Sequence, residues 1–429
     1  MKILWFANTP CEAEEKLTGK PVTGGGWLYA LSQEMKKNPQ VELHIAFYWG
    51  VPMEPFLYSG IYYHPVLRSG NSSKIGRYIY RLRSQFSDCY DAAEIPRLLE
   101  VVSSVNPDVI HIHGSEENFG LIAEHLDTRK ICMSVQGILG PYKNKYFSGI
   151  PKEVVQRNSP FIKRLLLDDS IASFRRFCRK TSREKRIYRK IDNIIGRTKW
   201  DDMCSLALNP KRKYYTCNEI LRSDFFKKEW VAPSNEKFKI VSTISFGLWK
   251  GVEVIFQAAQ FLEEAGFNFE WNVLGITAND EKAVFSEKMT SFNRKSSNVK
   301  FLGRMDSSRL IEQMMSSNLF VQVSRIENSP NTLCEAMLLG MPIIASYVGG
   351  TASMMKDGVE GNMYQEGEPY VLAGLIMDCE KNYAKYVGMG KNARVRASQR
   401  HNPQNVAQEL KRIYESICLS NDRVNDTRV

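Results

Sequence analysis

The stretch that decides the fold runs from Ser324 to Pro342 and has the sequence SRIENSPNTLCEAMLLGMP. It begins as the end of an apolar strand, turns, and continues with apolar residues at helical spacing. Ser329 is predicted to be the N-cap and Pro330 the first helical residue, because both residue types favour those positions. Gly340 ends the helix, and Pro342 prevents its continuation. The pattern therefore predicts a strand, a turn and a short helix.

This turn is a candidate ligand site, because it places backbone N–H groups at the carboxyl end of a strand, where open α/β sheets bind ligands. The N–H groups and the helix dipole suit a diphosphate. Glu327 at the strand end and Glu335 in the helix are placed to accept hydrogen bonds from hydroxyl groups. The remaining residues of the expected site are Ser329, Pro330, Asn331, Thr332 and Leu333.

Outward from this stretch, short apolar runs alternate with helical patterns along the whole chain. Such alternation predicts an α/β fold with parallel sheets covered by helices on both faces. The length of 429 residues suits two domains. The sequence Ala-Pro-Ser-Asn at 232–235 breaks the pattern near the expected boundary. We expect domains at 1–220 and 221–402, and a C-terminal helix at 403–429 that can pack back on the first domain.

The composition is that of an ordinary globular protein, with 43% apolar and 24% charged residues. The nine cysteines lack C-x-x-C spacing, which favours reduced thiols over a zinc site. No apolar run approaches the ~20 residues of a membrane span, and the apolar run at the start of the sequence is too short for a signal peptide. These features indicate a cytoplasmic protein.

Charge is unevenly distributed. Residues 1–220 contain 33 Lys and Arg against 23 Asp and Glu, a net charge of +10, whereas the remainder has 25 against 24. An excess of this kind predicts an anionic partner for the first half.

The second half resembles a known family. Glu327 and Glu335 are separated by seven residues and followed by Ala-Met-x-x-Gly-x-Pro. This resembles the E-x7-E motif of family-4 retaining glycosyltransferases, and the later Gly349-Gly350, Asp357-Gly358 and Gly361 resemble that family's trailing glycines. Two glutamates at this spacing are weak evidence alone, but the whole series in register is specific. Stretches at 134–139, 194–201 and 217–222 resemble a bacterial surface-polysaccharide branch.

The resemblance implies a GT-B fold, with two Rossmann-like domains whose parallel sheets face an interdomain cleft. It implies a hexosyl or other glycosyltransferase that moves a sugar from a nucleoside-diphosphate sugar to a glycan or lipid-linked acceptor, with retention. The second domain would bind the donor and the first the acceptor. Glu327 would position the donor sugar. No metal or other cofactor is implied, since the nucleotide sugar is a co-substrate.

Lys250-Gly251 resembles the family's Lys-Gly pair, whose lysine holds the donor diphosphate as a point charge. The alternative is that Lys250 is an exposed lysine at the start of a helix, with no role in ligand binding. The chain departs from the family pattern, because Ser245 stands where an arginine is often found. Arg304 or Arg325 are the candidates to replace that arginine.

In the first half, Thr23-Gly24-Gly25-Gly26-Trp27 resembles the family's glycine-rich loop, and Gly25 and Gly26 are expected to approach the donor phosphates. His111 and His113 alternate on one face of a strand. His113 matches the family's catalytic histidine position at the cleft end, whereas His111 is more readily a satisfied buried histidine.

Two residues are acceptor-side candidates by the same resemblance. They are Gln136 and Arg197, although Arg197 could instead pair with Asp192, Asp201 or Asp202.

The stretch from Arg175 to Lys190 contains nine cationic residues and one acidic residue, with apolar residues between them. A basic amphipathic helix can lie on an anionic membrane, and the inner face of the cytoplasmic membrane is the expected location. The alternative is the solvated face of a long helix. Nucleic acid is not expected, since no recognised binding motif is present.

Two other functions fit the same donor fold. A GT-B sugar-nucleotide epimerase would need no acceptor, and a non-catalytic sugar-nucleotide-binding subunit would explain the missing loop arginine.

Overall fold

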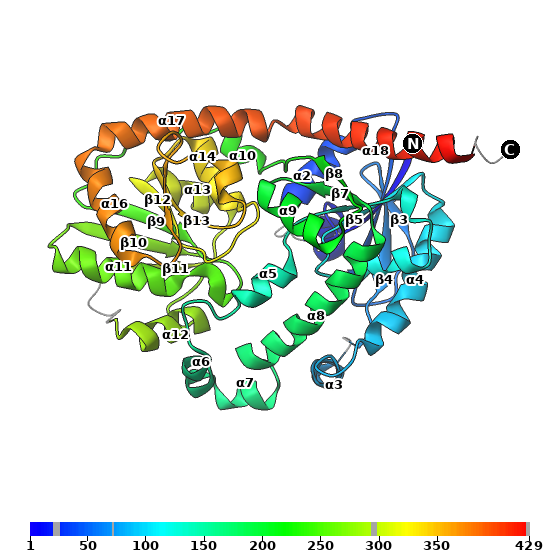
Figure 1. The fold of residues 1–429 in the computed structure, drawn as a ribbon, viewed down its shortest axis with the longest axis horizontal. Coiled ribbons are helices and arrows are strands. Elements are labelled where there is room, and N and C mark those ends of the chain that lie inside the picture. Colours follow the sequence, from blue (N-terminus) through cyan, green and yellow to red (C-terminus); the bar gives the residue numbers. More distant parts are fainter. Residues whose placement is uncertain (20–25, 71–72, 293–297, 426–429) are drawn as a thin grey trace. The chain divides into compact units, whose positions relative to one another are not determined.

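A computed structural model describes residues 1–19, 26–70, 73–292 and 298–425, which form two compact units (Figure 1). The first comprises Met1–Lys143, Phe161–Ile220 and His401–Val429, and the second Asn144–Pro160 and Leu221–Arg400. The expected ranges differ from these units in one main respect. The structure assigns residues 144–160 to the second unit, although they lie far before it in the sequence.

The second unit is built on a six-stranded sheet in the order β11-β10-β9-β12-β13-β14, and each neighbouring pair is parallel. The order reverses between β9 and β12, which makes their carboxyl ends the switch point of a doubly wound sheet. The strands are β9 (Phe238–Thr243), β10 (Phe269–Leu274), β11 (Val299–Gly303), β12 (Leu319–Gln322), β13 (Ile343–Tyr347) and β14 (Asn362–Gln365).

Helices cover both faces of this sheet, because side chains alternate between two cores. Ile240 and Val321 face a core with α11, α12 and α16, whereas Val241 and Phe320 face one with α10, α13, α14 and α17. The helices of this unit are α6 (Lys152–Asn158), α10 (Ser223–Phe226), η3 (Leu248–Lys250), α11 (Val252–Glu264), α12 (Glu281–Thr290), α13 (Ser307–Met315), α14 (Asn331–Leu339), α15 (Thr351–Met354), α16 (Pro369–Lys381) and α17 (Tyr383–Arg400).

The first unit has an eight-stranded sheet in the order β3-β4-β2-β1-β5-β6-β7-β8. Only the edge pair β3 and β4 is antiparallel among the described strands, and the order reverses between β1 and β5. The strands are β1 (Lys2–Phe6), β2 (Glu42–Trp49), β3 (Phe56–Tyr58), β4 (Ile61–Leu67), β5 (Val109–His113), β6 (Ile131–Ser134), β7 (Asn193–Gly196) and β8 (Lys213–Thr216).

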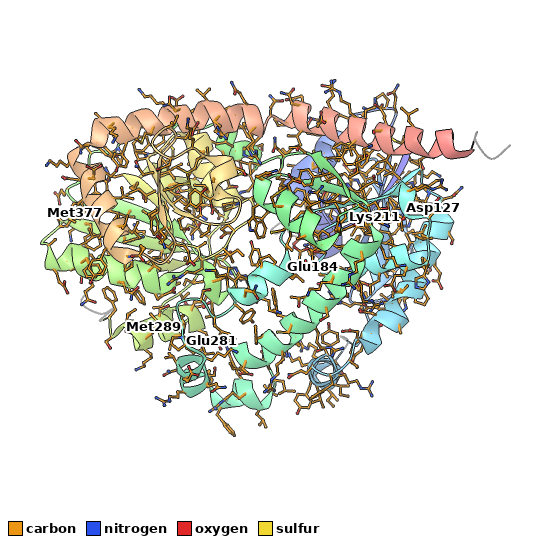
Figure 2. All side chains as sticks on the ribbon, viewed as in Figure 1. Asp127, Glu184, Lys211, Glu281, Met289 and Met377 are labelled. Carbon is orange, nitrogen blue, oxygen red and sulfur yellow. The ribbon has the colours of Figure 1, made fainter. Side chains whose placement is uncertain are left out.

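Two cores again flank the sheet, and side chains fill the space between strands and helices (Figure 2). The C-terminal helix α18 packs beside α2 in one of these cores. The helices are α1 (Ala13–Thr18), α2 (Gly26–Met35), α3 (Lys74–Arg83), α4 (Cys89–Val105), η1 (Phe119–Glu124), η2 (Thr128–Lys130), α5 (Leu139–Asn144), α7 (Phe161–Leu165), α8 (Ser170–Lys190), α9 (Lys199–Leu208) and α18 (Pro403–Asn425). Within the described residues, no helix is long and apolar enough to cross a bilayer.

Candidate active site

Lys250 and Glu327 meet at the switch point of the second sheet. Lys250 lies in the loop that follows β9, and Glu327 in the loop that follows β12. Their side chains form an ion pair between Nζ and Oε1 and are only 15% and 9% exposed. Two residues 77 positions apart are therefore brought together where doubly wound folds bind ligands.

The loop that carries Lys250 is held against the loop after β12 by a close backbone approach. Gly251 has a φ of +74°, and a Cβ at this position would collide with the carbonyl oxygen of Val323. The backbone N–H of Arg325 donates to the carbonyl oxygen of Trp249 at 2.7 Å. The glycine of the Lys-Gly pair is thus required because it lets the lysine reach Glu327.

A second glycine holds the backbone of Glu327 itself. Gly349 has a φ of +46°, and a Cβ there would collide with the carbonyl oxygen of Glu327. The next residue, Gly350, donates its backbone N–H to that same oxygen at 3.0 Å. The Gly-Gly pair that follows β13 therefore positions Glu327 rather than acting as a flexible loop.

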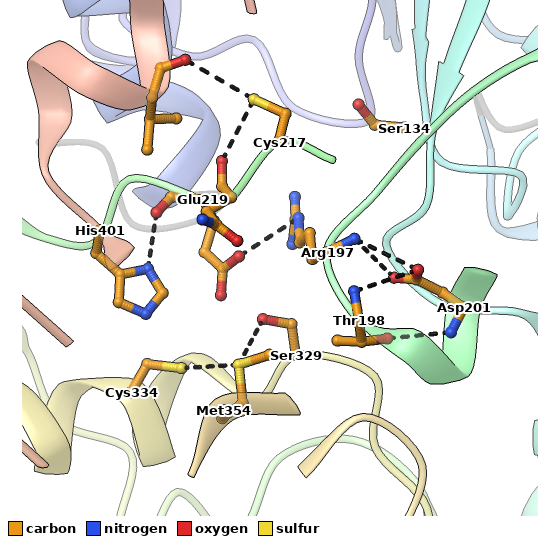
Figure 3. A network of polar contacts seen from close by, with 12 residues as sticks. Ser134, Arg197, Thr198, Asp201, Cys217, Glu219, Ser329, Cys334, Met354 and His401 are labelled. Atoms are coloured by element: carbon orange, nitrogen blue, oxygen red, sulfur yellow. Dashed lines mark hydrogen bonds and ion pairs between the residues drawn. The ribbon is translucent and has the colours of Figure 1, made fainter. Parts of the chain in front are cut away.

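The helix after Glu327 begins one residue later than predicted. Its N-cap is Pro330, and Ser329 does not cap it; the Ser329 hydroxyl instead donates to Met354 Sδ at 3.6 Å (Figure 3). The prediction of a Ser329 cap was wrong because Pro330 has an extended backbone, with ψ of 108°. The amides of Asn331 and Thr332 form the first turn, where N–H groups lack intrahelical acceptors. This end of α14 remains suited to an anion.

The rest of the predicted turn is packed inward. Leu333 is fully buried, and its N–H donates to the Pro330 carbonyl oxygen at 3.0 Å. The Thr332 hydroxyl accepts a hydrogen bond from Thr243 Oγ1 at the end of β9, at 2.8 Å. The first turn of α14 is therefore fixed to the neighbouring strand.

Glu335 lies buried in α14, and its carboxylate forms an ion pair with Arg222. Arg222 Nε donates to Oε1 at 2.7 Å and Nη2 to Oε2 at 2.6 Å, a two-pronged ion pair. Burial raises the pKa of Glu335, and Arg222 opposes that rise. Sequence reasoning missed Arg222, although it ends the 217–222 stretch that resembles the polysaccharide branch.

The two arginines expected to replace the missing loop arginine lie in different settings. Arg325 forms ion pairs with Glu253 at 2.9 Å and with Glu366 at 3.0 Å, so its charge is already balanced. Arg304 is exposed after β11, which β10 separates from the switch point. Arg222 is also paired, with Glu335, but it is partly exposed and lies beside α14, which makes it the better-placed cation.

In the first unit, β5 ends at His113, and the two histidines differ sharply. His111 is satisfied: Nδ1 shares a hydrogen bond with Tyr414 Oη at 2.6 Å and Nε2 with Ser134 Oγ at 2.5 Å. His113 is 2% exposed, and neither ring nitrogen has a hydrogen-bond partner among the described residues. Burial, His111 and Arg197 hold its pKa well below the usual range. His113 is therefore a neutral imidazole whose hydrogen-bonding groups are left for a ligand.

Aromatic rings and a cation surround His113. The Trp5 ring lies 4.6 Å from it and the Trp27 ring 5.8 Å, and the Arg197 guanidinium stands 4.4 Å over Trp27. Arg197 is buried and pairs with Glu219 at 3.5 Å, a partner that the sequence did not suggest (Figure 3).

The other first-unit candidates lie at the same end of the sheet. Gln136 donates through Nε2 to the His113 carbonyl oxygen at 3.0 Å, so it joins the ends of β5 and β6. Gly26 begins α2, directly before Trp27. Gly25 lies outside the described residues.

A buried acid on α8 holds this end of the first sheet. Glu184, which is labelled in Figure 2, accepts hydrogen bonds from Ser115 Oγ at 2.6 Å and from the backbone N–H groups of Leu139 at 2.8 Å and Gly140 at 3.0 Å. These partners follow β5 and β6. Sequence reasoning missed this role, because Glu184 stands as a single acid in a basic helix.

Most of α8 is in contact with other residues of the first unit. Ile187 and Tyr188 are buried in its core, so these apolar residues do not face outward. Five of the nine cations contact carbonyl or carboxylate groups of the same unit, namely Arg176 with Leu167, Arg179 with Asp88, Lys180 with Glu117, Arg183 with Asp91, and Arg186 with Glu124. Contacts within the first unit thus account for much of α8.

The fold and the second-unit site define a class, a two-domain α/β protein of the GT-B type, as the sequence predicted. Sucrose-phosphate synthase from Thermosynechococcus elongatus has the same fold, with a TM-score of 0.71, 16% identity, and coverage of 98% of this chain and 99% of that one. HepE of Anabaena in complex with UDP-glucose gives a TM-score of 0.62 at 17% identity, over 97% and 100% of the chains.

Residues 224–396, which lie in the second unit, match the family model of glycosyl transferases group 1. This segment includes Lys250, Glu327 and Glu335. The amylovoran biosynthesis glycosyltransferase AmsK of Erwinia amylovora is 22% identical over 190 residues. That similarity covers 43% of this chain and 46% of the relative, so the match spans about half of the relative's length.

Proposed function

We propose that this protein is a retaining glycosyltransferase that moves a sugar from a nucleoside-diphosphate sugar to a glycan or lipid-linked acceptor. The observation that carries the proposal is the convergence of Lys250, Glu327 and the start of α14 at the switch point of the second sheet. A diphosphate is an anion that a lysine and helix N–H groups can hold together. The group 1 domain at 224–396 supports the transfer chemistry.

In this proposal, the Lys250–Glu327 pair exchanges partners when the donor binds. The diphosphate attracts Lys250, and Glu327 is released to face the donor sugar. As the bond to the diphosphate breaks, negative charge grows on the leaving group, and Lys250 with the α14 amides stabilises it. Glu327 stabilises the positive charge that develops on the sugar. Retention follows the family resemblance, without an assigned protein nucleophile and without a metal.

Glu335 and Arg222 form the second part of the proposed donor site. A carboxylate has about four lone-pair positions, so Glu335 can accept from ribose hydroxyls while it keeps Arg222. Arg222 is then the cation that stands in for the missing loop arginine. On the acceptor side, His113, Gln136 and Arg197 are the proposed residues, with His113 offering a neutral imidazole to a sugar hydroxyl.

The names of similar proteins support the substrate class. AmsK is described as an amylovoran biosynthesis enzyme, and HepE was captured with UDP-glucose. We extend from these a role in polysaccharide biosynthesis at the cytoplasmic face of a membrane.

A donor panel tests the function directly. We expect one of the UDP, GDP, ADP or dTDP sugars to raise the melting temperature by mass action. With that donor, product should form only when an acceptor is present, and NMR should show the anomeric configuration of the donor retained. Turnover without acceptor would indicate an epimerase or simple hydrolysis of the donor, and binding without turnover would indicate a non-catalytic subunit.

Variants separate the two proposed sites in the same assays. Glu335→Ala should weaken the donor-induced melting shift. His113→Ala should reduce turnover more than His111→Ala does, since the ring nitrogens of His113, unlike those of His111, have no hydrogen-bond partner among the described residues. Normal turnover by His113→Ala together with an inactive His111→Ala would contradict the assignment.

A further inference from the structure

Two short helices of the first unit expose an unusual concentration of large apolar side chains. Among the residues that the structure describes, 25 large hydrophobic side chains are exposed, and nine of them lie in or beside α3 and α7. Ile75 is 73% exposed and Phe161 72%. Single exposed apolar residues are normal, but a cluster indicates an interaction site. This α3–α7 surface consists of Ile75, Tyr78, Ile79, Leu82, Phe86, Phe161, Ile162, Leu165 and Leu166.

The apolar residues of α3 form one stripe of the helix. Ile75, Tyr78, Ile79 and Leu82 recur at the spacing of a single helical face. The other side of α3 faces the protein, where the Tyr80 ring packs on Tyr90 at 4.7 Å between centroids. The stripe is therefore left outward by the packing of α3.

Both helices lie near the lower end of α8, where α8 begins (Figure 1). Arg81 of α3 forms an ion pair at 3.1 Å with Asp168, three residues after α7. Arg176 of α8 donates to the Leu167 carbonyl oxygen at 2.7 Å. These contacts place the apolar residues of both helices in one region of the first unit.

The charge of the α3–α7 surface indicates what kind of partner it binds. Neither α3 nor α7 contains an acidic residue. Arg77, Arg83 and Arg164 are exposed among the apolar side chains. Two copies of the surface facing each other would bring these like charges together, which disfavours self-association. Apolar and aromatic residues interleaved with cations suit the interface of an anionic bilayer.

We propose that the α3–α7 surface, rather than α8, is the site at which this protein binds an anionic lipid membrane. The apolar residues enter the acyl boundary, and Arg77, Arg83 and Arg164 contact the lipid head groups. Of the exposed α8 cations, Arg175 is five residues beyond the start of the helix and near this surface, whereas Lys185, Arg189 and Lys190 are at least 15 residues beyond it. At a rise of 1.5 Å per residue this is about 20 Å away, beyond the Debye length of about 10 Å at 0.1 M salt.

Vesicle co-sedimentation tests the proposal with the full chain and does not depend on the transfer reaction. Vesicles of phosphatidylcholine with phosphatidylglycerol should bind the wild type, and pure phosphatidylcholine at least about tenfold less. The variant I75S/L82S/F161S/I162S should bind anionic vesicles at least about tenfold more weakly. The control K185Q/R189Q/K190Q should stay within about threefold of the wild type, because those cations are remote. Melting temperatures of both variants should match the wild type, since the altered residues are exposed.

Vesicle binding at high salt distinguishes the insertion of apolar side chains from purely electrostatic adsorption. At 1 M salt the Debye length falls to about 3 Å, and we expect the wild type to keep part of its binding while the serine variant loses it. The proposal is overturned by equal binding of the serine variant, by a larger loss in the α8 control, or by equal binding to both lipids. It is also overturned if the wild type sediments as a dimer without lipid and the serine variant as a monomer, since the surface then joins two copies.

Discussion

At the scale of single residues, the candidate site depends on oppositely charged side chains that form ion pairs. Lys250 has Glu327, and Arg222 has Glu335. Each pair is at least partly buried, and removing one partner leaves the other charge uncompensated. Substitutions at these positions therefore report both the loss of a ligand contact and the release of a partner.

Glu327→Ala is expected to lower turnover at least about tenfold, or about 1.4 kcal/mol of barrier, because the developing charge on the sugar loses its carboxylate. Lys250→Ala should lower it as well, through the diphosphate. The double variant should lose less than the product of the two single effects, since the residues contact each other. Steady-state kinetics with the identified donor measures all three. Wild-type turnover by both single variants would rule out the assignment.

His111 makes the stability of the first unit sensitive to pH. Burial lowers its pKa from 6.5 to about 3. Between those values the unfolded chain binds a proton that the folded protein does not, so stability falls as pH is lowered from about 6.5. His111→Gln should reduce this slope by up to about 1.4 kcal/mol per pH unit. Urea unfolding of both proteins at pH 7.5, 6 and 5 measures it, and identical slopes would contradict the account.

At the scale of elements, loops with close backbone contacts set the position of each catalytic candidate. Gly251 brings the loop after β9 against β12, and Gly349 brings the loop after β13 against Glu327. In the first unit, Glu184 of α8 holds the loops after β5 and β6. Helices and strands thus supply the frame, and a few contacts between loops fix the site.

Gly349→Ala is expected to reduce both donor binding and stability, because its Cβ would push the Glu327 backbone out of place. Gly358→Ala is the matched control. Gly358 also has a positive φ, of +73°, but no atom lies within 4 Å of its Cβ position. The control should lose only the ~1–2 kcal/mol of a left-handed residue, with donor affinity unchanged. Thermal unfolding and donor titration compare them, and equal donor affinity in the two variants would argue against a positioning role for Gly349.

At the scale of the whole molecule, the C-terminal helix completes the first unit although the second unit precedes it in the sequence. Val406, Leu410, Ile413, Tyr414 and Ile417 are buried in one core of the first unit. The Tyr414 hydroxyl contacts both Trp5 Nε1, at 2.9 Å, and His111. The first sheet therefore depends on α18, a helix that follows the second unit in the sequence.

Ile413→Ala should destabilise the first unit by about 2–5 kcal/mol, because it leaves a cavity in that core. Leu419→Ala on the same helix is the control, since Leu419 is 63% exposed. Hydrogen exchange should rise in β1, β2 and β5 for Ile413→Ala, while the donor-induced protection of α14 is kept. Faster exchange confined to the second unit would show that α18 supports a different part of the molecule.

What the sequence alone determined was local. The alternation of apolar runs and helical patterns predicts the strands and the α/β class, because periodicity follows from burial on the two faces of each element. Gly340 marks the end of α14 because a left-handed C-cap favours glycine. The start of α14 was predicted one residue too early, since cap preference alone does not show the backbone that Pro330 adopts.

Only the tertiary structure decided which distant residues meet. Arg222 and Glu335 are 113 residues apart, and His111 and Tyr414 are 303 apart. Such pairs arise from strand order and helix packing, which no local period encodes. The same holds for α8 and α3: both are basic and amphipathic in sequence, and packing against the first sheet buries apolar residues of α8 while it leaves those of α3 exposed. Whether an apolar side chain lies in a core or on the surface is settled by the partner that covers it.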